Sequence, residues 1–293
     1  MFCSYKIDLG QVMNKQARVQ RNRVAFLSLL LAAWPPAPAQ PAPPAASAGL
    51  TVAPTRLVFD RHKRTGEVDL TNVGNAPGSY RVSLVAMEMD ENGGMAEQPL
   101  DARPDADTLR DLVHFGPRLV ALKPHEAQTV RVQIRRPADL PAGEYRVHLL
   151  VREEPAQAPE TEDGPGPQAL SIHLTSLFGV AIPLIIRQGE TSATVKVARL
   201  SLAPDRKRLT FRLERSGNQS VYGNLKAALL AASGPPRVLA EVNGMSVYTP
   251  NAFRNVELAL NPPAPAGTRI RVTYSSPEDQ GNILIAEAVL DAP

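Results

Sequence analysis

From residue 50 to its end, the chain is a series of short segments in which apolar and polar residues alternate with a period of two. Pro, Gly, Asn and Asp residues separate these segments, and no amphipathic helix of ordinary length interrupts them. A period of two is typical of strands that bury one face. Short strands with turn residues between them predict an all-β architecture of the sandwich type.

The alternating segments fall into two sets of seven predicted strands. The first set comprises 50–59, 66–72, 78–88, 113–122, 127–136, 144–153 and 170–186. The second set comprises 191–202, 207–215, 223–231, 236–242, 254–260, 268–276 and 282–290. A helical turn is expected within 104–113. The pattern therefore predicts an N-terminal sandwich domain over 50–188 and a C-terminal one over 189–293. Because almost no linker separates them, we expect a fixed angle between the two, in a boomerang arrangement.

The last strand of the first set is unusually long. Residues 169–189 read ALSIHLTSLFGVAIPLIIRQG, without Asp, Glu, Lys or Arg between Leu170 and Ile186. This run approaches the roughly 17–25 residues of a membrane-spanning helix. Its β-branched residues and its apolar even-numbered positions instead favour one strand of about 17 residues, against a usual length of about 5–6. Pro183 is then expected at an edge or a bulge, because proline has no N–H to donate to a ladder.

The N-terminus has the pattern of a secretory signal peptide. Three arginines precede the apolar run VAFLSLLLAAW at 24–34, and small residues and prolines follow it. Cleavage sites of the small-x-small type occur at 37–39 and 46–48, of which the first lies nearer the apolar run. We assign 1–39 as the signal peptide and 40–49 as a segment rich in Pro and Ala. An uncleaved anchor helix is the less favoured alternative, because this run of 11 residues cannot span roughly 30 Å, and we expect no stable membrane insertion of the mature chain.

Charge and cysteine content change once the leader is removed. The full chain has 32 Lys and Arg against 29 Asp and Glu, a net charge of +3. Without residues 1–39, 27 basic and 28 acidic residues remain, a net charge of −1. This balance does not favour nucleic acid or an anionic membrane as a partner. The single cysteine, Cys3, lies in the leader, so the exported domains are held together by their cores.

The sequence does not have the motifs of an enzyme. Its five histidines are not in a metal-binding spacing, and the common nucleotide, zinc and nucleophile motifs do not occur. We therefore expect a protein without catalytic residues, metal or cofactor.

Two segments carry a resemblance to a known family. APTRLVFD at 53–60 places Arg56 at the first strand, and EYRVHLLVREEP at 144–155 precedes the long strand. Together with a signal peptide and two sandwiches, these features resemble PapD-like periplasmic pilus chaperones over roughly residues 50–290. The resemblance implies two immunoglobulin-like β-sandwich domains and a location in the periplasm.

The resemblance also implies partners and site residues. The chain would bind pilus or fimbrial subunits by donor-strand complementation and deliver them to an outer-membrane usher. Arg56 would hold the C-terminal carboxylate of the subunit, while side chains of the long strand fill its groove. The implied subunit-binding residues are Arg56, Leu174, Phe178, Val180 and Ile182. Glu144 and Arg187 would form an interdomain ion pair, with Glu278 or Asp279 as a third member.

The chain departs from the family pattern at two positions. Leu150 stands where the signature usually has an asparagine, and Pro183 aligns with the basic residue of the long strand. Half of the carboxylate clamp is thus missing, and the chain resembles a divergent branch. Arg118, Lys123 or a backbone donor are alternative replacements.

Two other classes of protein fit parts of the sequence. A non-chaperone envelope structural or adhesive protein built of immunoglobulin-like domains would self-associate through its exposed strand. A carbohydrate-binding module is disfavoured, because the only tryptophan, Trp34, lies in the leader.

Overall fold

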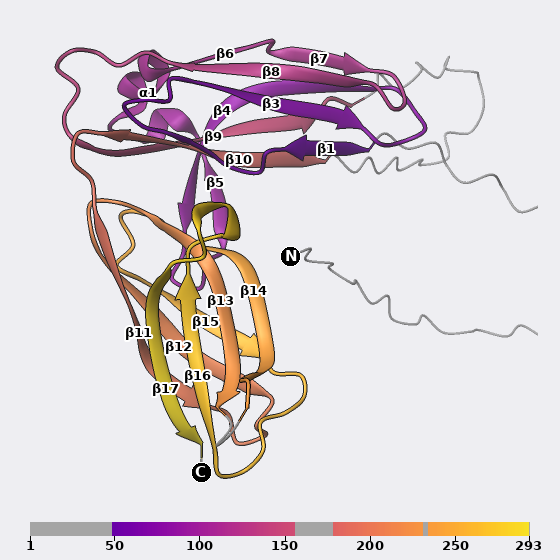
Figure 1. The fold of residues 1–293 in the computed structure, drawn as a ribbon. Helices are drawn as coiled ribbons and strands as arrows, with labels where there is room; N and C mark the ends of the chain where they lie inside the picture. The colour runs from indigo at the N-terminus through magenta and orange to yellow at the C-terminus, as the bar shows by residue number, and fades with distance from the viewer. Residues whose placement is uncertain (1–48, 156–177, 231–233, 293) are drawn as a thin grey trace, which may run out of the picture. The chain divides into compact units, whose positions relative to one another are not determined.

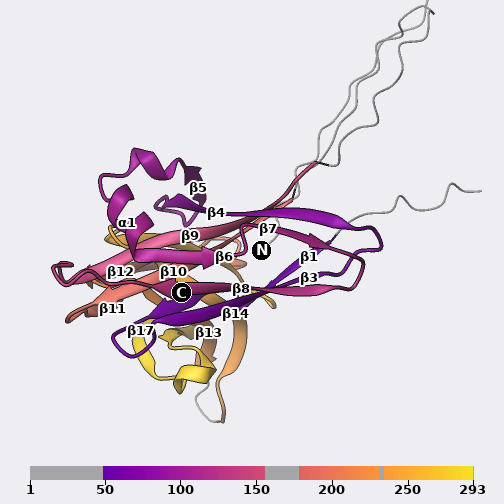
Figure 2. The same ribbon diagram turned by 90° about the horizontal axis from the view of Figure 1, so that it is seen from above.

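The computed structural model describes residues 49–155, 178–230 and 234–292. All of these residues belong to one compact unit, residues 45–293. Nearly all of its regular elements are strands, and they form two β-sandwiches that follow each other along the chain (Figures 1 and 2). The prediction of an all-β chain with two sandwich domains is confirmed.

The first sandwich pairs a four-stranded sheet with a six-stranded sheet. The four-stranded sheet has the order β1 (Leu50–Ala53), β3 (Thr65–Asn72), β8 (Ala127–Ile134), β6 (Val113–Gly116). The six-stranded sheet has the order β2 (Leu57–Phe59), β10 (Gly179–Gln188), β9 (Gly143–Glu153), β4 (Gly78–Met89), β5 (Met95–Gln98), and β7 (Leu119–Leu122) also pairs with β4. Apolar side chains from both sheets, including Leu70 of β3 and Leu149 of β9, form one core.

Two of the predicted strands are each divided between the two sheets. Residues 50–59 form β1 in one sheet and β2 in the other, and residues 113–122 are divided in the same way into β6 and β7. Pro54 and Pro117 lie in the breaks. Because proline has no N–H for a ladder, pairing ends there and the chain crosses to the opposite sheet.

A hairpin and a short helix complete the first sandwich. β4 runs on into a turn and returns as β5, a mostly exposed strand that the alternation pattern did not predict. A 3₁₀ turn (Leu100–Ala102) and α1 (Ala106–Leu112) follow, the latter within the expected helical turn. Leu109 and Leu112 of α1 are buried in the core, which explains why this segment is ordered.

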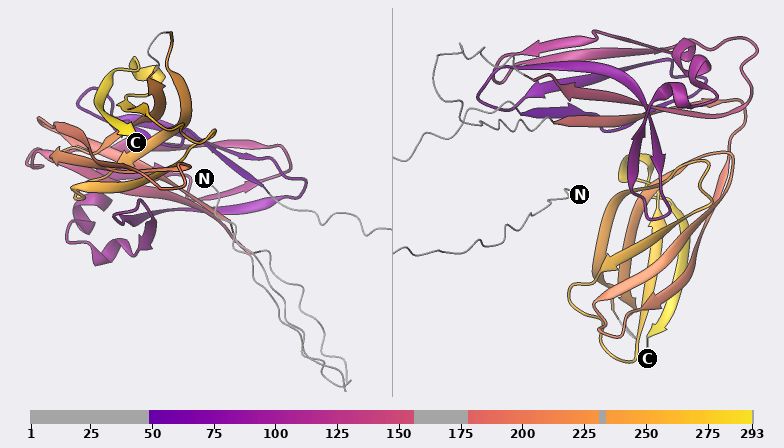
Figure 3. Two further views of the ribbon diagram at one scale, coloured as in Figure 1. Left: turned by 90° about the horizontal axis from the view of Figure 1, so that it is seen from below. Right: turned by 180° about the vertical axis from the view of Figure 1, so that it is seen from behind.

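The second sandwich contains a counterpart of every strand predicted for it (Figure 3). Its three-stranded sheet has the order β11 (Ala193–Leu202), β12 (Arg208–Gly217), β15 (Phe253–Ala259). Its four-stranded sheet has the order β14 (Arg237–Val247), β13 (Val221–Leu230), β16 (Thr268–Ser275), β17 (Leu284–Ala292), and a 3₁₀ turn, η2 (Glu278–Gln280), precedes β17. A second, separate apolar core fills this sandwich.

The link between the sandwiches is short, since β10 ends at Gln188 and β11 begins at Ala193. Gly189 in this link has a φ of +66°, and a Cβ there would lie 2.8 Å from Cβ of Ala142. Glycine is therefore required for the turn between the sandwiches. Among the described residues, no helix is long and apolar enough to cross a membrane.

Candidate functional site

The first part of β10 carries a row of apolar side chains that leaves the core of its own sandwich. Phe178, Val180 and Ile182 point to the same side, because side chains alternate along a strand. Phe178 is 66% exposed, Val180 packs partly against the core, and Ile182 is only 1% exposed. Phe178 and part of Val180 are therefore available to a partner.

The expected role of Ile182 in subunit binding is corrected by this burial. Its side chain already fills the first core, beside Leu184 and Ile186, and could leave only by opening that core. The expected contact at Leu174 lies outside the described residues, as do 170–177 of the predicted long strand. The described strand ends at Gln188, two residues later than predicted.

One side of β10 has an unpaired stretch of backbone. β9 pairs with the whole of β10, whereas β2 pairs with it only over Leu184–Ile186. The N–H of Glu153 donates to the carbonyl of Phe178 at 2.8 Å, so the even-numbered residues of β10 direct their backbone groups to β9. Gly179 and Ala181 then direct their N–H and C=O groups to the other side, where no described strand pairs with them.

Pro183 lies at the boundary between the unpaired and the paired part of this side. It has an odd number and so belongs to the residues that face away from β9, where its missing N–H removes no bond of the β9–β10 ladder. β10 lies between β2 and β9 in the sheet, but β2 pairs with it only from Leu184, so this side of the strand is locally open up to Pro183, which explains how a proline is accommodated inside an otherwise regular strand.

Arg56 lies next to the end of this unpaired stretch. It is the residue before β2, whose first residue, Leu57, is level with Leu184 of β10. Its guanidinium carbon lies 4.6 Å from the ring centroid of Tyr222 and 5.8 Å from that of Tyr248, distances at which a cation is attracted to an aromatic ring. Its Nη1 also donates a long hydrogen bond of 3.5 Å to the hydroxyl of Tyr248.

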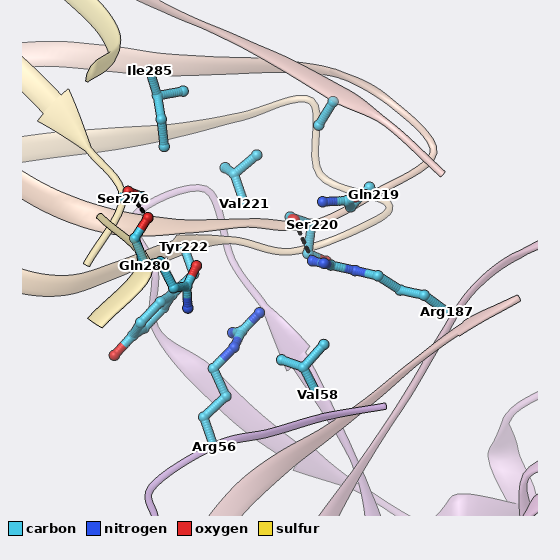
Figure 4. Close-up of a pocket in the computed structure, with 11 residues that line it drawn as sticks. Arg56, Val58, Arg187, Gln219, Ser220, Val221, Tyr222, Ser276, Gln280 and Ile285 are labelled. Atoms are coloured by element: carbon cyan, nitrogen blue, oxygen red, sulfur yellow. Dashed lines mark hydrogen bonds between the residues drawn. The ribbon is translucent and has the colours of Figure 1, made fainter. Parts of the chain in front are cut away.

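These contacts hold the Arg56 guanidinium without neutralising it. Among the described residues no carboxylate forms an ion pair with it, and burial lowers the pKa of Arg56 despite the partial compensation by Tyr248. Arginine nevertheless stays protonated in proteins. The charged Arg56 side chain lines a cleft of about 400 Å³, together with Val58, Tyr222 and Ile285 (Figure 4). Such a cleft suits an anion.

Glu144 and Arg187 form an ion pair as the family resemblance implies, but both residues belong to the first sandwich, and only their contacts with Ser220 reach the second. They lie opposite each other on β9 and β10, and Nε of Arg187 is 3.3 Å from Oε2 of Glu144. The Glu144 side chain is fully buried. The backbone N–H of Ser220, in the second sandwich, lies 3.1 Å from both carboxylate oxygens, and Nη2 of Arg187 donates to the carbonyl of Ser220 at 3.5 Å.

The third member of this network is therefore Ser220, and the expectation of Glu278 or Asp279 is wrong. Both acidic residues lie exposed in the 3₁₀ turn before β17, and no ion pair joins either of them to Arg187 in the described structure. A backbone amide satisfies the buried carboxylate without adding a second negative charge.

Sequence reasoning missed two polar residues of the same face of β9. Arg146 is buried and donates to the carbonyls of Met87 at 3.0 Å and Thr249 at 3.2 Å. Its guanidinium carbon lies 4.3 Å from the ring centroid of Tyr248, and the buried ring of His148 meets the same tyrosine edge-on. Glu144, Arg146 and His148 occupy alternate positions of β9, and the residues between them are apolar. This alternation was the signal in the sequence that could have identified a polar face.

The β4–β5 hairpin also contacts the second sandwich. The side-chain amide of Asn251 donates to the carbonyl of Met89 at 2.8 Å, and the backbone N–H of Asn255 donates to the carbonyl of Glu91 at 2.7 Å. Since β5 was not predicted, neither was this contact. The hairpin supports the region around Arg146 and Tyr248 from one side.

Chemically, the site combines an open strand edge, an exposed aromatic side chain and an unneutralised guanidinium. The described residues contain no group of three or more His, Cys, Asp or Glu side chains arranged to hold a metal ion. Binding of an extended, anionic peptide end is the chemistry that this arrangement offers.

Comparison with known proteins gives matches among solved structures only. No protein-family model matches the chain, and no curated protein matches it. The YadV chaperone is 14% identical, with 82% of this chain and 99% of the other covered and a TM-score of 0.40. The CupB2 chaperone of Pseudomonas aeruginosa is 15% identical, with 83% and 98% covered and a TM-score of 0.42. A Salmonella enterica SafA pilin complex with the SafB chaperone gives 15% identity, 83% and 96% coverage and a TM-score of 0.40. At these identities and TM-scores the matches carry no argument about the function of this chain.

Proposed function

We propose that this chain is a periplasmic chaperone for pilus or fimbrial subunits, which it binds by donor-strand complementation and delivers to an outer-membrane usher. The observation that supports this most is the position of Arg56 at the end of the unpaired stretch of β10. The resemblance of the segments around Arg56 and Glu144 to PapD-like chaperones points to the same function. The proposal requires no catalytic group, metal or cofactor.

The arrangement of β2 suggests the direction of a bound strand. β2 runs parallel to β10 and begins pairing at Leu184. A subunit strand that pairs with Gly179 and Ala181 in the same direction would end where β2 begins, with its C-terminal carboxylate at Arg56. An antiparallel strand would bring an N-terminal ammonium group to the same place, where two like charges repel each other. The charge of Arg56 therefore favours a parallel strand that ends there.

Magnitudes separate the roles of Phe178 and Arg56. Burial of the Phe178 side chain in a subunit groove is worth about 1.5–3 kcal/mol, and a hydrogen bond between Arg56 and a carboxylate contributes about 1.5–3 kcal/mol. Each new backbone hydrogen bond at Gly179 or Ala181 adds about 0.5–1.5 kcal/mol. Apolar and backbone contacts would accept many strands, whereas the Arg56 contact requires the chain to end at one place. A shift of the register by one residue would also turn the apolar side chains of β10 away from the subunit groove.

Co-purification with a candidate pilus or fimbrial subunit tests this proposal. We expect Arg56→Gln and Phe178→Asp each to reduce recovery of the complex, and the double variant to abolish it. Leu119→Asp places the same charge at another exposed apolar residue of the first sandwich, and Arg131→Gln removes an exposed arginine from β8. Both controls should recover the complex fully. Unchanged recovery with a correctly folded double variant would overturn the proposal.

A further inference from the structure

Two guanidinium groups open on the cleft beside Arg56. Arg56 enters it from the residue before β2, and Arg187 enters it from β10 (Figure 4). The positive charge of Arg187 is close enough to contribute to the lowered pKa of Arg56, after burial and against the opposing influence of Tyr248. The cleft therefore receives two cations from the first sandwich.

The charges around this cleft do not balance. Glu144 is the only carboxylate among the described residues that pairs with Arg187, and both of its oxygens also accept from the N–H of Ser220. Arg56 adds a second positive charge; Glu144 attracts it at longer range, but among the described residues no carboxylate forms an ion pair with it. One buried negative charge thus faces two positive charges, and the cleft has room for one further anion.

Arg187 is held less firmly than another arginine nearby. Arg215 donates to three backbone carbonyls at 2.7–3.0 Å, those of Asn251, Gly217 and Gln219, and is nearly buried. Arg187 is 3.3 Å from Glu144 and 3.5 Å from the carbonyl of Ser220, and its side chain is 26% exposed. The Gln219 amide can accept from its Nη2 at 3.1 Å when its oxygen faces the arginine. Arg187 is therefore partly accessible to solvent, and its contacts with Glu144 and Ser220 are long.

The position of Arg187 on β10 is related to that of Pro183. They are four residues apart on one strand, so their side chains project from the same face. Pro183 has no charged side chain. Arg187 has one, on the same face of β10, and its side chain lines the cleft.

We propose that Arg187 is the second cation of the carboxylate site, so that the end of a bound strand lies between Arg56 and Arg187. This inference rests on the proposed function. The incoming carboxylate competes with Glu144 for Arg187, and Glu144 therefore weakens binding. Because Arg187 also contacts Ser220, the bound end of the strand and the contact between the two sandwiches share one side chain.

The test uses an eight-residue peptide of alternating Thr and Val with a fluorescein label at its N-terminus. It is prepared with a free C-terminal carboxylate and with a C-terminal amide, and fluorescence anisotropy gives the affinity of the full mature chain for each. The ratio of the two affinities measures recognition of the carboxylate. We expect Arg187→Gln to reduce this ratio about tenfold, the size of one charge-assisted hydrogen bond. Glu144→Gln should raise it, and Arg187→Lys should keep more of it than Arg187→Gln does.

Arg187→Gln is expected to lower the affinity ratio and Glu144→Gln to raise it. These opposite effects distinguish a direct role of Arg187 in binding from a structural role. Both variants break the same ion pair, so a merely structural effect would lower the ratio equally in both, and that result would overturn the inference. If Glu144→Gln does not fold, equal losses in Arg187→Gln and Arg187→Lys would overturn it instead. Failure of the proposed function looks different, because the wild-type chain and Arg56→Gln would then bind the carboxylate and amide peptides with the same affinity.

Discussion

Pro183 on β10 lies directly opposite His148 on β9, on the face of the sheet that also carries Glu144 and Arg187. The imidazole is almost completely buried beside Tyr248, and its Nδ1 has no hydrogen-bond partner. Burial, and then the positive charges of Arg146, Arg103 and Arg56, lower the pKa of His148 to about 3. His148 is therefore neutral near pH 7 and does not replace the basic residue that the family resemblance places at Pro183.

The low pKa of His148 predicts a dependence of stability on pH. The unfolded chain protonates His148 near pH 6.5, whereas the folded chain keeps it neutral down to about pH 3. Between these values the unfolded state binds more protons, so the free energy of unfolding falls as the pH is lowered. We expect a slope of at most about 1.4 kcal/mol per pH unit from this residue, and a smaller slope in His148→Gln. Urea unfolding between pH 7 and pH 5 measures both, and equal slopes would contradict the burial of a neutral histidine.

Arg146 is expected to contribute to stability through two backbone carbonyls. Arg146→Met leaves the carbonyls of Met87 and Thr249 without these donors, at an expected cost of about 1–3 kcal/mol in the free energy of unfolding. Arg131→Met is the matched control, because the Arg131 side chain is 84% exposed. We expect it to change stability by less than about 0.5 kcal/mol. Equal values from the two variants in urea unfolding would show that Arg146 has no such role.

The turn of the β4–β5 hairpin gives a test of its contact with the second sandwich. Gly93 has a φ of +86°, and a Cβ there would overlap the guanidinium of Arg254, which donates to the carbonyl of Ser246 at 3.1 Å. Gly234 has a φ of +93°, and no atom of the described residues beyond its chain neighbours lies within 4 Å of such a Cβ. Alanine at either position carries a backbone penalty of about 1–2 kcal/mol, and only Gly93→Ala should also displace the Arg254 guanidinium from the Ser246 carbonyl, at a further cost of about 0.5–1.5 kcal/mol. Thermal unfolding compares them, and equal losses would mean that the position of the Arg254 guanidinium beneath this turn contributes nothing to stability.

The alternative of an envelope structural or adhesive protein differs in its self-association. A chaperone that keeps its strand edge for a client should sediment as a monomer over a wide range of concentration. A structural protein that pairs its own edges should show larger species as the concentration rises. Sedimentation velocity distinguishes them, and association that Phe178→Asp abolishes would favour the structural protein.

The sequence pattern was sufficient for most strands because each one buries a single face, which imposes alternation on its residues. It was not sufficient where alternation continues across a sheet change, as at Pro54 and Pro117, because the period does not reveal which sheet a residue joins. β5 escaped prediction for a different reason, since most of its side chains are exposed and their polarity is unconstrained.

The candidate site was predictable only in part. The resemblance supplied Arg56 and the pair Glu144 and Arg187. Ser220 contacts Glu144 through its backbone N–H, which does not depend on the side chain, so the sequence could not identify it. The apolar row of β10 reads the same from Phe178 to Ile186, although its first member is exposed and the members from Ile182 onward are buried. Periodicity shows which side a residue faces, whereas the place where the core ends depends on the other strands.

Hydrogen exchange of the β10 amides tests the central claim, that the unpaired side of this strand binds the client. In the free chain the N–H groups of Gly179 and Ala181 should exchange fast, while those of Val180 and Ile182, which face β9, should exchange slowly. In a complex with a pilus or fimbrial subunit, we expect Gly179 and Ala181 to become protected and the other two to stay so. If the complex forms while Gly179 and Ala181 exchange as fast as before, the client binds elsewhere and the account is contradicted.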